Sequence, residues 1–376
     1  MSAKSPGLSE LIAAGIADGG PLTFARFMEL ALYHPRLGYY ASGRAKIGRG
    51  GDFYTNVSVG SVFGRVLAAQ FREMWHHLGQ PAEFCLVEQG ANDGQFAEDV
   101  LTALAEIPLT YWIVEPAAPL REMQQEKLRN QGDRVRWVEK VESLPVFEGV
   151  HFSNELLDAL PFHLVQSNGS AWEELFVTAR DGAFAFVPAA PSPSLEDDLR
   201  TFPTRPAGTL AEVRPAVRGW LHTLGEKLRT GYVLAVDYGF PRAQLLAPHR
   251  REGTFSCYQA HRRDARPLEE PGQKDITAHV DFTALAAAAR ENGFRIEGFT
   301  DQHHFLVGAS ESLLKSLDGP PDIAAQKMLR GLQTLLHPES MGTQFHYLAL
   351  SKGLAEQKPL AGFRHAREAE GALFTT

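Results

Sequence analysis

The sequence predicts an α/β protein built on a doubly wound, mostly parallel sheet. From Pro81 onward, short apolar runs alternate with helical stretches, which is typical of a parallel sheet covered by helices. Several of the runs end in an acid, as is common where strands reach a ligand-binding edge. The chain has 376 residues, 44% hydrophobic content and a net charge of -8. These values fit a globular protein and argue against a nucleic-acid-binding surface.

Residues 1–80 are predicted to form an N-terminal helical cap with a glycine-rich lid. Apolar residues recur at helical spacing within residues 8–12, 24–31 and 59–75. Residues 39–56 hold four glycines and include Gly51 and Asp52. This composition suits a loop that closes over a ligand, although a plain connector has the same composition.

Residues 81–352 are predicted to form the sheet-containing core, and residues 353–376 a C-terminal tail. We expect seven strands, for which apolar runs occur at 84–87, 111–114, 135–138, 150–153, 232–236, 294–299 with 305–308, and 345–351. Helices are expected at 95–106, 117–131 and 323–336. The last two strands are expected at a sheet edge. Residues 160–230 are predicted to be an inserted, substrate-side subdomain, with a hairpin that turns at Asp181-Gly182.

The stretch from Phe84 to Gly94 gives the strongest local signal for a ligand site. A buried strand is predicted to end at Glu88, the chain turns at Gly90, and Gly94 lets the next helix pack closely. A second apolar run ends at Glu115, where a carboxylate would meet the hydroxyls of a nucleotide ribose. Asn92 replaces the middle glycine of a dinucleotide fingerprint, so the spacing resembles a site for S-adenosylmethionine more than one for NAD. Packing alone produces such a turn about as often.

Polar residues also follow the strand expected at 150–153. They are Asn154, Glu155 and Asp158. If this segment is helical, the two acids share one face because they are three residues apart. Helix capping is the competing interpretation, since Asn is a common N-cap and acids are favoured in the first turn.

The cysteines and the apolar runs predict a cytoplasmic protein without metal. Cys85 and Cys257 give neither a disulfide framework nor zinc-ligand spacing. No apolar run approaches the roughly 18 residues of a membrane span, and no convincing signal peptide is present. We therefore expect neither membrane insertion nor export.

Several longer motifs resemble one methyltransferase family. They are Gly19 to Pro35 with Gly38-Tyr-Tyr40, Gly51-Asp-Phe53, Ser153 to Pro161, and Asp275 to Phe282. Over roughly residues 19–350, the chain is similar to the S-adenosylmethionine-dependent methyltransferases that include the mitochondrial complex I assembly methyltransferase and its bacterial relatives.

The resemblance implies a class I methyltransferase core and, as in the characterised mitochondrial relative, methylation of an arginine on a complex I subunit. By position, the cofactor-binding residues would be Glu88, Gly90, Gly94 and Glu115, with Gly51 and Asp52 in the capping loop, while Asn154, Glu155 and Asp158 would face the substrate. Two departures put the substrate in doubt: the family's usual Thr-Ser-Pro is here Thr55-Asn56-Val57, and the glycine turn carries Asn92.

Arginine methylation suits the acids at these positions. A guanidinium is always protonated in proteins and presents a planar fork that carboxylates bind in a bidentate manner. Glu155 with Asp158 would orient one nitrogen, with His163 or His261 as proton relays. The alternatives are an assembly factor that binds cofactor without turnover and an NAD-dependent oxidoreductase. A protein substrate is expected, and a homodimer is one of the oligomeric states that the sequence allows.

Overall fold

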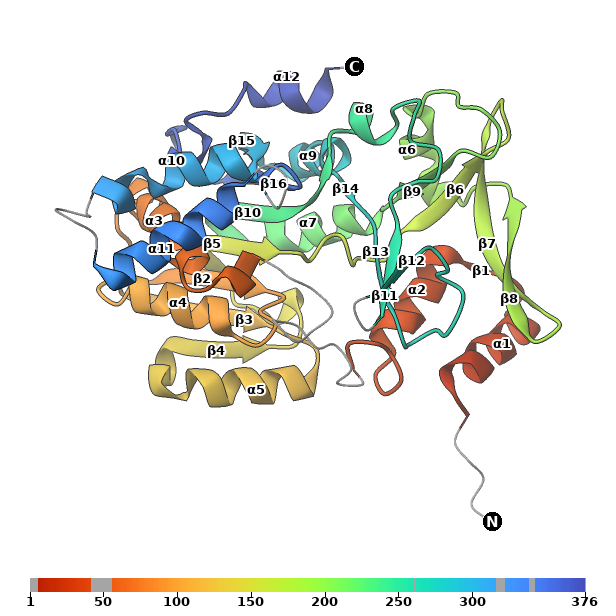
Figure 1. The fold of residues 1–376 in the computed structure, drawn as a ribbon, viewed down its shortest axis with the longest axis horizontal. Helices are drawn as coiled ribbons and strands as arrows, with labels where there is room; N and C mark the ends of the chain where they lie inside the picture. The colour runs from red at the N-terminus through yellow and green to blue at the C-terminus, as the bar shows by residue number, and fades with distance from the viewer. Residues whose placement is uncertain (1–5, 42–55, 260–261, 316–321, 338–341, 376) are drawn as a thin grey trace, which may run out of the picture. The chain divides into compact units, whose positions relative to one another are not determined.

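The computed structural model describes residues 6–41, 56–259, 262–315, 322–337 and 342–375. The chain divides into two compact units, each assembled from segments that are distant in sequence (Figure 1). Unit 1 draws on Met1–Phe53, Leu157–Gly219 and Arg242–His279, and unit 2 on Tyr54–Leu156, Trp220–Pro241 and Val280–Thr376.

Unit 2 contains an eight-stranded sheet. Its strands are β2 Phe84–Gln89, β3 Leu109–Val114, β4 Val135–Val138, β5 Phe147–Asn154, β10 Leu228–Phe240, β14 Val280–Asp281, β15 Arg295–Asp301 and β16 Phe345–Lys352. The order is β15-β16-β10-β5-β2-β3-β4, and the short β14 pairs with β10. In the run β10-β5-β2-β3-β4, each strand is parallel to the next, while β16 is antiparallel to both of its neighbours, β10 and β15. The α/β class expected from the sequence is confirmed.

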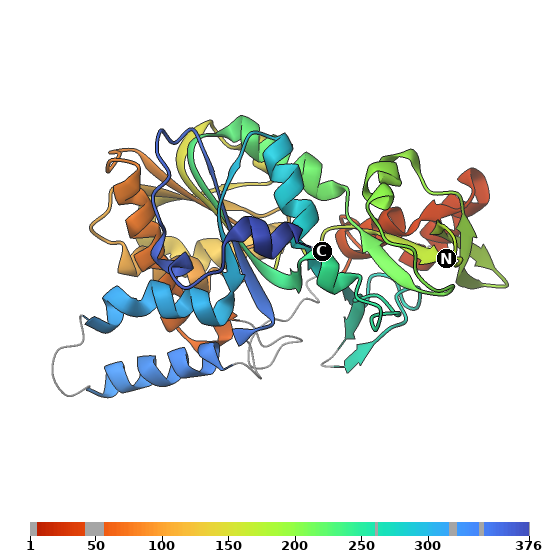
Figure 2. The ribbon, with the colours of Figure 1, turned by 90° about the horizontal axis from the view of Figure 1, so that it is seen from above.

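Helices cover both faces of this sheet, because successive strand residues point to opposite sides. The helical elements of unit 2 are η1 Asn56–Val59, α3 Val62–His77, α4 Gln95–Ala103, α5 Ala118–Leu128, η2 Arg129–Arg134, η3 Val141–Ser143, α9 Phe282–Glu291, α10 Gln302–Lys315, α11 Ile323–Leu336, η6 Ala361–Phe363 and α12 Ala369–Phe374. Phe152 packs with α3 and α4, whereas its neighbour His151 meets Trp220 of α7 (Ala216–Lys227) on the other face. Helices α10 and α11 lie side by side (Figure 2).

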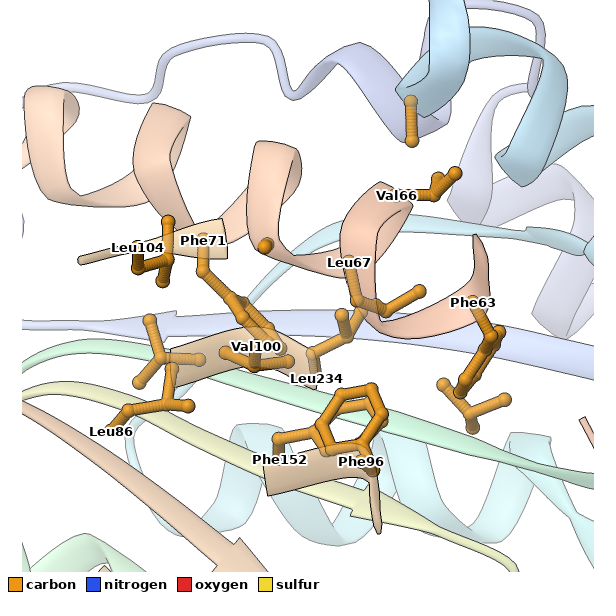
Figure 3. Packing of buried hydrophobic residues seen from close by; sticks show 14 of the residues in the cluster. Phe63, Val66, Leu67, Phe71, Leu86, Phe96, Val100, Leu104, Phe152 and Leu234 are labelled. Atoms are coloured by element: carbon orange, nitrogen blue, oxygen red, sulfur yellow. The ribbon is translucent and has the colours of Figure 1, made fainter. Parts of the chain in front are cut away.

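The core beneath α3 and α4 is aromatic. The rings of Phe96 and Phe152 stack with centroids 4.6 Å apart, and Phe71 meets Phe152 edge-on at 5.5 Å. Figure 3 shows these rings together with Leu67 and Val100 between helix and strand. Since Phe152 lies two residues before Asn154, this packing also fixes the end of β5.

Two segments differ from the sequence-based prediction. Residues 305–308 belong to α10 rather than to a strand, because Phe305, Leu306 and Ala309 form the buried face of a helix. So short an apolar run does not distinguish the two structures. Strand β16 lies inside the sheet between β15 and β10, whereas the sequence placed it at an edge.

Unit 1 is built on antiparallel strands. Its elements are α1 Leu8–Gly19, β1 Leu22–Thr23, α2 Phe24–Tyr33, β6 His163–Ser167, β7 Trp172–Arg180, β8 Ala183–Ala189, η4 Pro193–Leu195, α6 Glu196–Arg200, β9 Leu210–Val213, α8 Arg242–Leu245, β11 Ser256–Gln259, β12 Arg262–Asp264 and β13 Asp275–Thr277. They form a five-stranded and a three-stranded sheet. The predicted hairpin is confirmed: β7 and β8 are joined at Asp181 and Gly182, with φ of 51° and 80°.

The domain boundaries expected from the sequence follow the chain, whereas the two units group segments that fold together. Helix α3 therefore packs on the sheet of unit 2 although it lies within residues 1–80. In the part of the chain that the structure describes, none of the helices has the length and apolar character needed to span a bilayer.

We expect Phe152→Ala to lower the free energy of unfolding by about 3 to 5 kcal/mol, because it leaves a cavity under two aromatic rings. Urea unfolding checks this. Met123→Ala, at a position 50% exposed on α5, is the control and should change stability by less than about 0.5 kcal/mol. A loss below about 1 kcal/mol for Phe152→Ala would contradict the packing argument.

Candidate functional site

The turn after β2 runs through three residues with positive φ. Gly90 has φ 83°, Asn92 48° and Gly94 80°. The Gly94 amide donates to the Ala91 carbonyl at 2.8 Å, and helix α4 begins at the next residue. Glycine adopts this backbone region without a steric penalty, and Asn tolerates it better than most residues. The predicted turn therefore forms where the sequence placed it, with Asn92 as its third left-handed residue.

Glu115 lies directly after β3 and is buried. One carboxylate oxygen accepts the Ala117 amide at 2.9 Å, and the other accepts Nε2 of Gln124 at 3.3 Å. Burial raises the pKa of Glu115, while these two donors lower it. Each carboxylate oxygen accepts two hydrogen bonds, so the acid has the capacity to bind further donors such as hydroxyls.

Gln124, on α5, connects the glycine turn to Glu115. Its Nε2 donates both to the Asn92 carbonyl at 2.8 Å and to Glu115, and its Oε1 accepts the Trp137 indole N–H at 3.1 Å. Its side chain is completely buried. The sequence analysis missed this residue, because a glutamine on a polar helix gives no local signal.

Glu88 is buried one residue before the end of β2. It accepts the Tyr111 hydroxyl at 2.7 Å. Burial raises the pKa of Glu88 to about 8, the Tyr111 hydrogen bond lowers it, and Asp93 raises it. Glu88 is therefore mainly protonated at neutral pH, and its bond to Tyr111 joins β2 to β3 directly before the turn.

The segment after β5 is not helical, so the helix that would place Glu155 and Asp158 on one face is wrong. Glu155 is a bend residue with φ 55°. Its amide donates to the Val236 carbonyl at 3.0 Å, and the next amide, of Leu156, donates to Asp237 at 3.2 Å. Bonds to β10 thus replace the helical hydrogen bonds, and Asp237 fixes this turn.

The side chain of Asn154 lies between two partners. Its Nδ2 donates to Glu155 at 3.0 Å, and its Oδ1 accepts Nδ2 of Asn56 at 3.3 Å. Asn56 is fully buried. It was noted in the sequence only as a departure from the family motif.

Parallel register brings these residues to one edge. Gln89 pairs with Val114 on one side and Ser153 on the other, so Gly90, Glu115 and Asn154 follow at one level. We call the residues that directly follow β2, β3 and β5, together with Asn154, the carboxyl edge. Three neighbouring parallel strands end there, and this is where ligands bind in open α/β sheets.

Asp158 belongs to unit 1 and is described within it. Burial raises its pKa to about 6, and Arg214 lowers it. The Arg214 guanidinium donates to the carbonyls of Asp158 and Leu160, which holds this turn. Tyr40 donates to Asp275 in the same unit at 2.9 Å. Burial raises the pKa of Tyr40, and the charges of Asp275 and Asp158 raise it further.

The remaining predicted site residues have simpler outcomes. His163, proposed as a relay, pairs through Nδ1 with Glu174 at 2.6 Å across β6 and β7, which is a structural contact of unit 1. Gly51, Asp52 and His261 lie outside the described residues, as do residues 42–55 of the lid predicted within 39–56.

Comparison with known proteins identifies the family. A family model described as "Putative S-adenosyl-L-methionine-dependent methyltransferase" matches residues 66–300, which is more than half of the chain. The chain belongs to this methyltransferase family. A crystal structure of a Burkholderia thailandensis protein bound to S-adenosyl-homocysteine superposes with a TM-score of 0.87 at 32% identity, covering 98% of this chain and 100% of that one.

Two curated relatives of this methyltransferase carry a more specific name. The mitochondrial protein arginine methyltransferase NDUFAF7 homolog of Drosophila melanogaster is 27% identical over 95% of this chain and 88% of its own length. The mitochondrial protein arginine methyltransferase NDUFAF7 of Homo sapiens is 28% identical over 94% and 84%. The cofactor of this methyltransferase is S-adenosylmethionine.

The residues of the carboxyl edge fit this cofactor. Glu115 has acceptor capacity for ribose hydroxyls, and the turn at Gly90 exposes backbone in place of a side chain. Asn56 Oδ1 is a buried acceptor with no partner among the described residues. S-adenosylmethionine carries both hydroxyl and ammonium donors, which are the groups that such acceptors bind.

We expect Gly90→Val to abolish S-adenosylmethionine binding, because a β-branched residue at positive φ distorts the turn and fills the edge. Gly79→Val is the matched control. Gly79 has φ 84° and open space around its Cα, so it shares the backbone cost of roughly 1 to 2 kcal/mol without touching the site. Calorimetric titration of both variants checks this, and normal binding by Gly90→Val would exclude the turn from the site.

We expect Glu88→Gln to change the pH dependence of stability. Since folding raises the pKa of Glu88 from 4.5 to about 8, the folded state keeps a proton that the unfolded state has lost. Wild-type stability should therefore fall, relative to Glu88→Gln, as pH rises from about 5 to about 8, by at most about 4 to 5 kcal/mol. Urea unfolding at several pH values measures it. The exposed Glu83→Gln should follow wild type, and parallel pH profiles for Glu88→Gln and wild type would refute the assignment.

Proposed function

We propose that this methyltransferase modifies an arginine side chain of a protein. The observation that carries the proposal is the Glu155 carboxylate, held at the carboxyl edge by Asn154 and by a turn bonded to β10. The names of the Drosophila and human relatives support the acceptor class. The motif resemblance suggests a subunit of the respiratory complex I type as the acceptor protein.

The residues of the carboxyl edge would act by positioning. Bound S-adenosylmethionine supplies a methyl group on a sulfonium, which transfers by in-line displacement, and alignment of the reactants is the main catalytic demand. Glu155 adopts a left-handed backbone that is uncommon for a residue with a side chain, and such strain persists where surrounding bonds determine it. The Glu155 amide bond to Val236 and the Leu156 amide bond to Asp237 supply that constraint.

Glu155 would orient the guanidinium. A carboxylate accepts up to four hydrogen bonds, and Asn154 donates one to Oε1. The planar fork of arginine matches the acceptor positions that remain on the carboxylate. The negative charge would polarise the bound nitrogen while its proton leaves during methyl transfer. We keep Asp158, which lies in unit 1, as a proposed substrate-facing residue.

Finer features of the architecture are part of the proposal. We propose that the path β15-β16-β10-β5-β2-β3-β4 is the seven-stranded, doubly wound sheet of class I methyltransferases, to which β14 adds a short strand. Residues 1–80 would act as cap and lid, and residues 160–230 as the substrate-side insertion. Cys85 and Cys257 are both free, which supports a reducing compartment, and we keep cytoplasmic location as a proposal although the curated relatives are named mitochondrial.

An assembly factor that binds cofactor without turnover is the second candidate. A scaffold requires affinity for cofactor and partner but not a strained carboxylate at the carboxyl edge, so Glu155 favours the enzyme. Mass spectrometry of host proteins with and without the gene tests this directly. Methylarginine that depends on the gene supports the enzyme, whereas unmodified proteins and normal assembly would favour the scaffold.

We expect Glu155→Gln to lower methylation by about a hundredfold or more, which is about 2.7 kcal/mol, while the dissociation constant for S-adenosylmethionine stays within about threefold. The substitution keeps the shape and removes the charge. Purified protein, isotope-labelled S-adenosylmethionine and lysate from cells that lack the gene give the rate, and calorimetry gives the affinity.

Glu126→Gln is the control, since Glu126 is 74% exposed and pairs, among the described residues, only with the similarly exposed Arg129. Glu126→Gln should retain wild-type methylation. Full activity of Glu155→Gln would mean that Glu155 takes no part in the transfer step.

A further inference from the structure

Asn56 carries a buried acceptor that the folded chain does not use. Its side chain is 0% exposed, and its Oδ1 has no hydrogen-bond partner among the described residues. Burying an acceptor without a donor is costly, so most such groups in native proteins meet a protein group, a water or a ligand. We therefore expect Asn56 Oδ1 to accept a hydrogen bond from a donor that is not among the described residues.

The orientation of the Asn56 amide follows from its neighbours. Glu155 is an acceptor when ionised, so Asn154 must turn its Nδ2 toward Glu155. Asn154 then points its Oδ1 acceptor at Asn56, so Asn56 must donate to it through its own Nδ2. This arrangement leaves Asn56 Oδ1 as the atom without a partner among the described residues. Flipping the Asn56 amide would place two oxygens against each other.

This acceptor is held next to the carboxyl edge by its bond to Asn154. Asn154, to which Asn56 is bonded, follows Ser153, and Ser153 pairs with Gln89 directly before Gly90. Asn56 is thus bonded to the end of β5, the strand next to β2, which leads into the turn proposed to hold the cofactor. S-adenosylmethionine carries a cationic N–H donor, its α-ammonium group, and charge-assisted hydrogen bonds are stronger than neutral ones.

We propose that Asn56 Oδ1 accepts a hydrogen bond from the α-ammonium group of bound S-adenosylmethionine. The inference rests on the cofactor site of the proposed function and adds to it the residue that reads the amino-acid part of the cofactor. It also gives a role to a departure noted in the sequence: the family's usual serine is here an asparagine, whose longer side chain reaches both Asn154 and a ligand.

The test compares cofactors with and without the amino-acid part. Asn56→Leu keeps a similar volume and removes the acceptor. It should weaken S-adenosylmethionine and S-adenosyl-homocysteine by about 10- to 100-fold in calorimetric titrations, the range for a hydrogen bond to a charged group. Binding of 5′-methylthioadenosine, which lacks the amino-acid part, should change by less than about threefold.

Ser153→Ala is the matched control, because Ser153 is also buried with an unpartnered hydroxyl among the described residues, on the opposite face of β5. It should bind all three compounds like wild type. Thermal unfolding of each variant confirms that it is folded.

Two results would overturn the inference. Unchanged S-adenosylmethionine affinity in Asn56→Leu would mean that another donor, such as a water or the acceptor guanidinium, meets Oδ1, and a lower methylation rate at unchanged affinity would assign it to the acceptor. Equal weakening of all three compounds would mean that Asn56 only shapes the edge. Failure of wild type to bind S-adenosylmethionine would instead sink the proposed function itself.

Discussion

The buried amide of Gln124 is the interaction on which the carboxyl edge depends. It holds the Asn92 carbonyl of the glycine turn, the Glu115 carboxylate and the Trp137 indole at once. Such a network is rigid when every member is satisfied and costly when one is missing. Because Gln124 lies on α5, the packing of that helix sets the distance between the turn after β2 and the acid after β3.

The two most buried acids of unit 2 are accommodated in different ways. Glu88 accepts the Tyr111 hydroxyl, and burial raises its pKa to about 8, so it is held mainly as a neutral acid near the end of β2. Asp237 accepts the backbone amides of Leu156 and Tyr238 and fixes the chain after β5. Glu88 therefore joins two neighbouring strands, whereas Asp237 holds the backbone that follows β5 to β10.

The backbone after β5 separates Glu155 from Asp158, which the sequence analysis had placed together on one face of a helix. Glu155 sits in a left-handed bend bonded to β10, and Asp158 lies in unit 1, where Arg214 holds the carbonyls of its turn. The Asn154 side chain continues the carboxyl edge to Asn56. A relay of amides therefore joins the glutamate proposed for the substrate to an acceptor proposed for the cofactor.

The sequence by itself determined the α/β class, most strands of the sheet, the turn between Glu88 and Gly94, the acid at Glu115, and the methyltransferase family. These features rest on local patterns: apolar runs, glycine spacing and motifs that read along the chain. The helical nature of 305–308 escaped it, because four apolar residues fit either structure until their partners are known.

Only the tertiary structure decided what meets across the chain. Gln124, Tyr111 and Asn56 have no local signature, and each gains its role from a partner distant in sequence: Asn92, Glu88 and Asn154 respectively. The bend at Glu155 likewise depends on the carbonyl of Val236, more than eighty residues away. Local sequence determines which backbone conformations have low energy, but a hydrogen bond between remote segments decides which of them is adopted. That bond exists only once the sheet has formed.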